Sequence, residues 1–407
     1  MKELERKLFC TILILQPLLK LYGIGAIGGT FADYTLIIMV IIMLIKQGKN
    51  VFKLTGNKNS IEFIPIMICV ILNIFFTWNF SFEIGNQIIY WIRYILYYFV
   101  LIYGIKKYYS VEIGYKVYEI ASIISTIFLI IQYLAYIFMD RIILGQFGPL
   151  ALTDLKQHKQ FYDTYAAYNL FRPESFFSEP SHYATFICGF LLICSMRQVN
   201  RKNILIMAFC SLGILLSGST TGLCGAFFIW TLFLLRLMKK KNSIVYLLPI
   251  IVIAAIVLVC VSQTVSFQIM MQRTFNSRDA IKSRFDWGDS LHILCSPLTW
   301  MFGYGSSSDV IELTGWIPGW VIILVQYGII GVALFVLSYL LLFLHSNKNG
   351  KIILVYFLIM GLGTELVADE YVLVLMPFVI NKYGKESGCN KIGYSGNKKR
   401  YKILINN

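Results

Sequence analysis

Residues 117–139 read VYEIASIISTIFLIIQYLAYIFM, and this stretch decides the class of the fold. It carries one charged residue, Glu119, and it can cross a bilayer, since a span needs about 20 mostly apolar residues. Similar stretches recur along the chain. We predict about twelve spans, with eleven as the alternative, near residues 8–27, 31–46, 62–79, 88–105, 117–139, 180–196, 203–218, 221–237, 243–263, 316–344, 351–366 and 368–381.

The composition supports an all-α integral membrane protein. Apolar residues make up 57% and charged residues 14% of the chain, with a mean hydropathy of +0.69. A soluble domain carries about 25% charged and 45–50% apolar residues. The sequence therefore predicts one polytopic membrane domain over 1–381 and a basic tail over 382–407; the last two spans are short enough to form a re-entrant pair.

The distribution of Lys and Arg predicts the orientation. Alternating the spans places the N-terminus, the short connectors and the tail on one side, with 26 of the 36 Lys and Arg against 5 acidic residues. Cytoplasmic loops retain positive charge, so both termini are predicted to be cytoplasmic. The two large loops, 140–179 and 264–315, are then extracytoplasmic. The net charge of +15 is explained by this topology and by anionic lipid, not by nucleic acid.

The first large loop ends in FRPESFFSEPSHY, residues 171–183, where Pro180 suits the first turn of a helix. One interpretation is an anion bound by an arginine beside a carboxylate that takes a proton, because paired carboxylates can have separated pKa values. The alternative is a capping carboxylate and an interfacial aromatic. The candidate residues are Arg172, Glu174, Glu179, His182 and Tyr183.

The second large loop contains a run of cations followed by Asp289 and His292 at i,i+3 spacing. Guanidinium groups suit phosphate because they donate two parallel hydrogen bonds. A solvated, salt-bridged helix would look similar. FGYGSSSD (302–309) is only a weak candidate for a phosphate cradle, since it lacks the Walker lysine. The cations are Arg273, Arg278, Lys282 and Arg284.

Other polar features have two interpretations each. LLSGSTTGLCGAF (215–227) predicts close helix packing or a polar groove. Arg93 is embedded in a span and is either functional or paired with a carboxylate such as Glu119 or Glu365. Glu365 also belongs to a third outer cluster with Asp369 and Glu370. For His158 and His345 the sequence indicates no partner.

Several motifs are missing from the sequence. The outer loops contain no DxD pair, and the chain has no HExxH, GxSxG or CxxC motif. We therefore expect a metal-independent reaction without a cofactor.

With these motifs in place, the chain resembles the bacterial polysaccharide polymerase and O-antigen ligase superfamily, the Wzy-like membrane proteins. The match consists of two large outer loops before the sixth and tenth spans, the Glu-Pro end of the first loop with LSGSTTG after it, and the helix WVIILVQYGIIGVALF (320–335). The second loop adds Ser283, Arg284, Trp287, Pro297 and the GYG run 303–305.

The resemblance implies glycosyl transfer from undecaprenyl-pyrophosphate-linked glycans at the outer face of the plasma membrane. It implies that Arg172, Arg278 and Arg284 hold the pyrophosphate and that Glu179 or His292 is the base. A chain-length regulator is a candidate partner.

Two alternatives remain open. Ligases carry a histidine where this chain reads TGWIPGWVI (314–322), which favours a polymerase. A flippase or other secondary carrier should show short loops on both faces, repeated halves and helices broken in mid-membrane. The sequence shows none of these.

Overall fold

The structure is a computed structural model of the protein. It describes residues 2–23, 29–48, 62–77, 84–145, 171–197, 200–238, 262, 268, 289–305, 317–362, 364 and 370–381. Outside these residues lie the predicted span 243–263, most of both outer loops and the tail 382–407.

The regular structure in the described residues is helical, apart from one isolated bridge between Gly23 and Thr30. The helices are α1 (Lys2–Leu19), α2 (Phe31–Gln47), α4 (Ile64–Thr77), α5 (Ile84–Phe99), α6 (Ile105–Tyr108), α7 (Val111–Met139), α9 (Pro180–Ser195), α10 (Arg201–Ser217), α11 (Thr220–Met238), α15 (Pro297–Phe302), α17 (Gly319–His345), α18 (Lys348–Met360) and α19 (Tyr371–Ile380). A π-helical turn, Val100–Gly104, joins α5 to α6.

Each predicted span that falls mostly on described residues overlaps helical structure, although α1 ends at Leu19, well before the predicted end at residue 27. Among the described helices, four are long and apolar enough to cross a membrane: Gln87–Tyr108, Val111–Met139, Thr220–Met238 and Gly319–His345. The all-helical class is confirmed, whereas the number of crossings stays a prediction.

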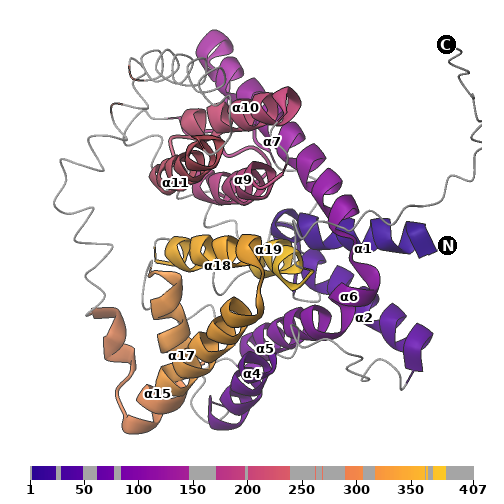
Figure 1. Ribbon diagram of the computed structural model, residues 1–407. Coiled ribbons are helices and arrows are strands. Elements are labelled where there is room, and N and C mark those ends of the chain that lie inside the picture. The colour runs from indigo at the N-terminus through magenta and orange to yellow at the C-terminus, as the bar shows by residue number, and fades with distance from the viewer. Residues whose placement is uncertain are drawn as a thin grey trace, which may run out of the picture.

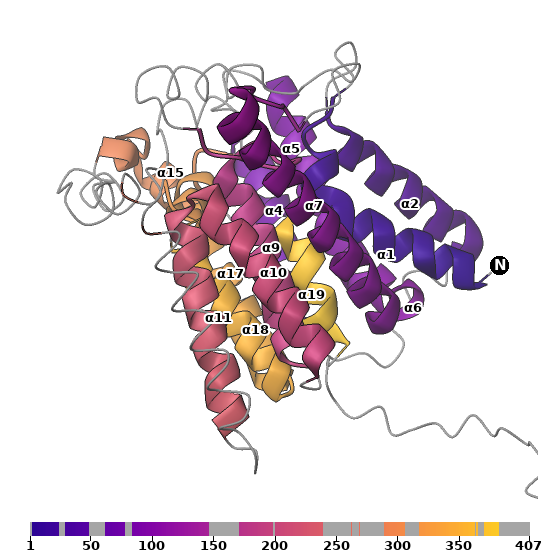
Figure 2. The same cartoon turned by 90° about the horizontal axis from the view of Figure 1, so that it is seen from above.

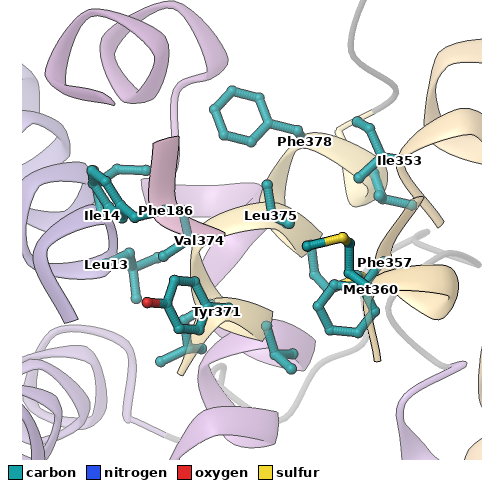
Figure 3. Close-up of a cluster of buried hydrophobic side chains, with 14 of the residues drawn as sticks. Leu13, Ile14, Phe186, Ile353, Phe357, Met360, Tyr371, Val374, Leu375 and Phe378 are labelled. Atoms are coloured by element: carbon teal, nitrogen blue, oxygen red, sulfur yellow. The ribbon is translucent and has the colours of Figure 1, made fainter. Parts of the chain in front are cut away.

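The helices form two groups with a shared centre (Figure 1). α9, α10 and α11 pack together on one side, and α4, α5 and α17 on the other. α19 lies between them, and all ten of its residues are buried. A helix that is apolar on every side must be buried. Figure 3 shows its contacts, with Val374 and Leu375 of α19 among side chains from α1, α9 and α18.

Ion pairs connect segments that were predicted to share a face. On the predicted cytoplasmic side the pairs are Lys46 with Glu5 (2.6 Å), Arg197 with Glu112 (2.9 Å) and His345 with Glu62 (2.9 Å). Lys20, which was predicted to lie within the span 8–27, pairs with Glu370 of the third predicted outer cluster (2.9 Å). The first three pairs show that these segments lie close together, whereas the alternation of the loops stays a prediction. They also show that His345 has a partner, which its sequence neighbours did not indicate.

Among the described residues the partner of Arg93 is not Glu119, and Glu365 lies outside the described residues. The Arg93 guanidinium forms a double ion pair with Asp33, with Nε–Oδ1 at 2.6 Å and Nη2–Oδ2 at 2.7 Å. Glu119 instead pairs with Lys202 (2.9 Å). The interpretation that Arg93 pairs with a carboxylate is thus confirmed, but the carboxylate belongs to Asp33, because nothing in the sequence shows that α2 and α5 are neighbours.

α17 is broken in the middle of its apolar stretch. Gly328 has φ 67° and ψ −171°, a conformation open essentially to glycine alone. The carbonyl of Val325 accepts a hydrogen bond from Tyr304 N (2.8 Å), and that of Gln326 accepts one from Gly305 N (3.1 Å). Asn73 Nδ2 also donates to the Gln326 carbonyl (2.8 Å). A broken helix is therefore present, contrary to the expectation from the sequence.

Candidate functional site

The end of the first outer loop, residues 171–179, is folded into the helical body against α7. Ser175 has a left-handed conformation with φ 58°. Its N–H donates to Gln132 Oε1 (2.7 Å), and its hydroxyl donates to the Ser125 carbonyl (2.7 Å). Polar groups of α7 thus hold the loop in place and satisfy backbone that would otherwise lack partners away from water.

Aromatic side chains fasten the same loop on both sides of Ser175. The ring pairs are Phe171 with Tyr136 (centroids 4.8 Å apart), Phe176 with Phe128 (4.3 Å) and Phe177 with Phe186 (5.2 Å). Gly145 lies so close that a Cβ there would be 1.6 Å from the Ser175 carbonyl oxygen. The loop is therefore a fixed part of the bundle, with the side chains of Arg172 and Glu174 carried on it.

Arg172 joins the loop to the turn between α10 and α11. Its Nη2 donates to the carbonyl of Gly218 (3.1 Å), which ends α10 with φ 62°. The run 215–227 therefore contacts the predicted site. It also serves close packing, because a Cβ on Gly222 would lie 2.4 Å from the Cβ of Ala184.

Glu174 is a buried acid. The residue is 2% exposed, and in the described part of the chain its Oε2 has no hydrogen-bond partner. Burial, and to a smaller extent the charge of Glu179, raise the pKa of Glu174 to about 9. The group is neutral at pH 7, so it can donate a hydrogen bond but cannot act there as a base.

Glu179 stands at the start of α9, with Pro180 in the first turn as predicted. The Glu179 side chain is exposed and forms no capping hydrogen bond; its Oε2 accepts from Ser181 Oγ (2.9 Å). His182 Nδ1 lies 2.7 Å from Ser178 Oγ. An exposed carboxylate and an imidazole thus share the first turn of α9.

Tyr183 lies in the core. It is 0% exposed, and its hydroxyl is 2.9 Å from Thr126 Oγ1. A Cβ on Gly213 would be 2.1 Å from the same hydroxyl. This position is typical of a packing residue, and a substrate contact of Tyr183 stays a prediction.

The described part of the second outer loop packs elsewhere. α15 lies against α4 and α17, and Phe302 stacks on Phe76 with centroids 3.6 Å apart. His292 is exposed in a short 3-10 turn that begins at Asp289. The first loop lies on α7 and α10 instead, so the described contacts do not unite the two predicted halves of the site. The predicted cations lie outside the described residues: Arg273, Arg278, Lys282 and Arg284.

The FGYG run closes the break in α17. The N–H groups of Tyr304 and Gly305 donate to α17 carbonyls, and Gly303 N donates to Thr299 O (2.8 Å). A Cβ on Gly303 would lie 2.2 Å from the Gln326 carbonyl oxygen. These amides cannot also cradle a phosphate, so the structure assigns the glycines to packing.

A comparison with known families finds a match for this chain. The family model described as WcaD colanic acid polymerase matches residues 11–280, more than half of the chain. The chain belongs to this family. No curated protein matches it. The family is one of enzymes that polymerise repeat units in polysaccharide synthesis, which confirms the resemblance to Wzy-like polymerases.

The match to the polymerase family covers α1 through α11, including the loop 171–179 and the turn at Gly218. Sequence reasoning missed the α7 residues that hold this loop. The signal was present, because the apolar stretch 117–139 carries small polar residues and a glutamine at helical spacing on one face. They are Ser122, Ser125, Thr126 and Gln132, all buried; of these, Gln132 contacts the loop with its side chain and Ser125 with its backbone carbonyl.

For metal binding, the described residues contain no group of three His, Cys, Asp or Glu side chains that could hold an ion. Metal independence stays a prediction for this polymerase family member.

Proposed function

We propose that the protein polymerises undecaprenyl-pyrophosphate-linked oligosaccharide repeat units into O-antigen or capsular polysaccharide at the outer face of the bacterial plasma membrane. The observation that carries the proposal is the polymerase family match, which includes the loop 171–179. Ion pairs that join the predicted cytoplasmic segments to one another support placing the N-terminal segment and these connectors on one face; the excess of Lys and Arg in them supports the cytoplasmic side.

In the proposed reaction, an acceptor hydroxyl of one repeat unit attacks the anomeric carbon of the lipid-linked chain. The bond from that carbon to the pyrophosphate oxygen breaks, and the lipid pyrophosphate leaves with the electron pair. The protein must stabilise the charge of the leaving group, align the hydroxyl and take its proton.

Arg172, Arg278 and Arg284 are the proposed pyrophosphate ligands, with Arg273 as a further cation nearby in the sequence. Support for Arg172 comes from its position, since the Gly218 carbonyl holds its guanidinium at the turn between α10 and α11. A guanidinium already oriented loses less conformational freedom when it binds an anion.

The proposed base is Glu179 or His292, and Asp289, three residues before His292, is proposed as a further catalytic residue. The exposed position of Glu179 beside His182 supports the first choice. Glu174 is proposed as a substrate contact that donates its proton in a hydrogen bond, because its raised pKa keeps it neutral.

One observation favours a second candidate, a lipid-linked oligosaccharide carrier. Discontinuous helices are typical of secondary transporters, and α17 is discontinuous at Gly328. In transporters such a break lines the ligand site. Here the freed carbonyls are bonded to Asn73 and to residues 304–305, which supports a structural role.

Gene deletion, with the surface polysaccharide resolved by size on a gel, separates these functions. Loss of a polymerase leaves a single exported repeat unit that is never extended. Loss of a ligase leaves full-length polymer on its lipid carrier, and loss of a flippase leaves repeat units on the cytoplasmic side. Either of the last two results would refute the proposal.

A further inference from the structure

A cavity opens between α11, α17 and α18, on the side of the molecule opposite to the loop 171–179. α11 contributes Phe228 and Leu232, and the end of α17 contributes Phe343 and Ser346. Figure 2 shows α11 and α18 running side by side along this edge. The cavity volume is about 490 Å³, within the range of roughly 300–1,000 Å³ found for small-molecule sites.

The cavity has a charged end. Lys348 and Lys351 stand at i,i+3 in the first turn of α18 and line it. The Lys351 ammonium lies 5.1 Å from the centre of the Phe343 ring, so its stem follows the apolar wall. The acidic residue Glu62 is paired with His345 (2.9 Å), which precedes the lining residue Ser346 in the chain. The charge that the cavity offers is positive.

The other end of the cavity is apolar and faces outward. Ile352 and Val355 line it one and two turns further along α18. Val355 is 37% exposed, and its neighbour on the same surface, Ile359, is 47% exposed. From Lys348 to Val355 the helix rises about 10 Å. The cavity therefore has two lysines at one end and an apolar groove that runs from them along α18, in the direction of the membrane interior in the proposed orientation.

We propose that this cavity binds one anionic phospholipid of the cytoplasmic leaflet, with its phosphate on Lys348 and Lys351 and its first acyl methylenes along Phe228 and Val355. Basic pockets between transmembrane helices on the cytoplasmic side bind acidic headgroups in this way. The inference rests on the proposed orientation of the protein. Its consequence is structural, because α18 packs directly on the buried helix α19.

The test uses the full-length protein purified in a neutral detergent, with bound lipid counted by native mass spectrometry and its effect on stability followed by thermal shift. Phosphatidylglycerol is compared with phosphatidylcholine of the same acyl chains and with inorganic phosphate. We expect phosphatidylglycerol alone to bind and to raise the melting temperature. The double variant K348Q/K351Q should bind it roughly thirty-fold more weakly.

Two further variants keep the result interpretable. K106Q/K107Q removes the same charge from the end of α6, where Lys107 also lies near an aromatic ring (5.8 Å from Tyr108), and should bind normally. Val355→Trp fills the groove without changing charge and should weaken binding several-fold. Equal binding by wild type and K348Q/K351Q, equal loss in the α6 variant, or an equal effect of phosphate alone would each overturn the proposal. None of these readouts depends on polymer formation.

Discussion

In the described part of the chain, non-helical backbone packs within the helical body at the break in α17 and at the loop 171–179, and these two differ in what they leave unsatisfied. At the break in α17, the freed carbonyls accept hydrogen bonds from the side chain of Asn73 and from the backbone of residues 304–305, and all of these groups are uncharged. At the loop 171–179 the backbone is held just as firmly, by Ser125 and Gln132. This loop, however, also brings an arginine and a buried acid with it.

The difference separates scaffold from site. A buried carboxyl group with no partner costs free energy, and such costs collect where a protein works on a ligand. The α17 break carries no charge, so it needs no ligand to complete it. We therefore expect changes at the break to act on folding and changes in the loop to act on activity.

The largest effect is expected for Arg172→Ala, which should abolish polymer while the protein still inserts into the membrane. Arg172→Lys keeps the charge but not the fork that reaches Gly218, and it should restore only part of the activity. Polymer length on a gel, with protein level by immunoblot, measures both. Arg284→Ala is expected to behave as Arg172→Ala does. Normal polymer in both alanine variants would remove the arginines from the mechanism.

Next in size is Gly328→Ala at the break in α17. Alanine cannot adopt φ 67° with ψ −171° without strain, and its Cβ would lie 2.4 Å from the Met301 backbone. A loss of stability on the order of 3 kcal/mol is expected. Gly48→Ala is the matched control, since Gly48 also has positive φ (50°) but a Cβ there would meet no atom within 4 Å. Thermal unfolding in detergent that affects both variants equally would mean that close approach at Gly328 contributes nothing.

Asn73→Ala should have a smaller effect of the same kind. It removes the donor to the carbonyls of Gln326 (2.8 Å) and Phe302 (3.0 Å) and should cost about 1–3 kcal/mol. The specific activity per folded molecule of Asn73→Ala should change little. Gln132→Ala, which releases the loop, should lower the specific activity at a stability similar to that of Asn73→Ala. If Asn73→Ala lowered the specific activity and Gln132→Ala did not, the break in α17 would belong to the site and the loop 171–179 to the scaffold.

A further prediction is a pH dependence of stability from Glu174. Its folded pKa of about 9 lies above that of an exposed glutamate, so the folded state holds the proton more tightly. The unfolded chain releases this proton first as pH rises, and stability therefore falls between about pH 4.5 and 9. Glu174→Gln mimics the neutral acid and should flatten that slope. Melting temperatures of both proteins at pH 5, 7 and 9 give the answer, and parallel slopes would show that Glu174 is not the cause.

The sequence predicted the helices well because each is a local property of composition. The apolar stretches end at charged connectors, and the structure places α2, α9 and α11 within one or two residues of the predicted spans. Pro180 fixed the start of α9 in the same local way.

What the sequence could not supply was the neighbour of each helix. Arg93 was assigned the wrong carboxylate, because Asp33 becomes its partner only through the packing of α2 on α5. For Tyr183 the sequence did not show that its hydroxyl lies against Thr126 and Gly213. The break at Gly328 depends on a segment some 25 residues earlier folding back onto it, which no local pattern announces.

The length of α7 has a consequence for the bilayer. Its 29 residues extend about 43 Å, while the hydrocarbon layer is about 30 Å thick. A helix longer than the hydrocarbon layer must tilt or extend beyond it, and a thicker membrane reduces the tilt. Because Ser175 is tied to α7, the loop tilts with this helix. The acyl-chain length of the surrounding lipid is therefore expected to change the position of Arg172 and Glu174 relative to the membrane surface.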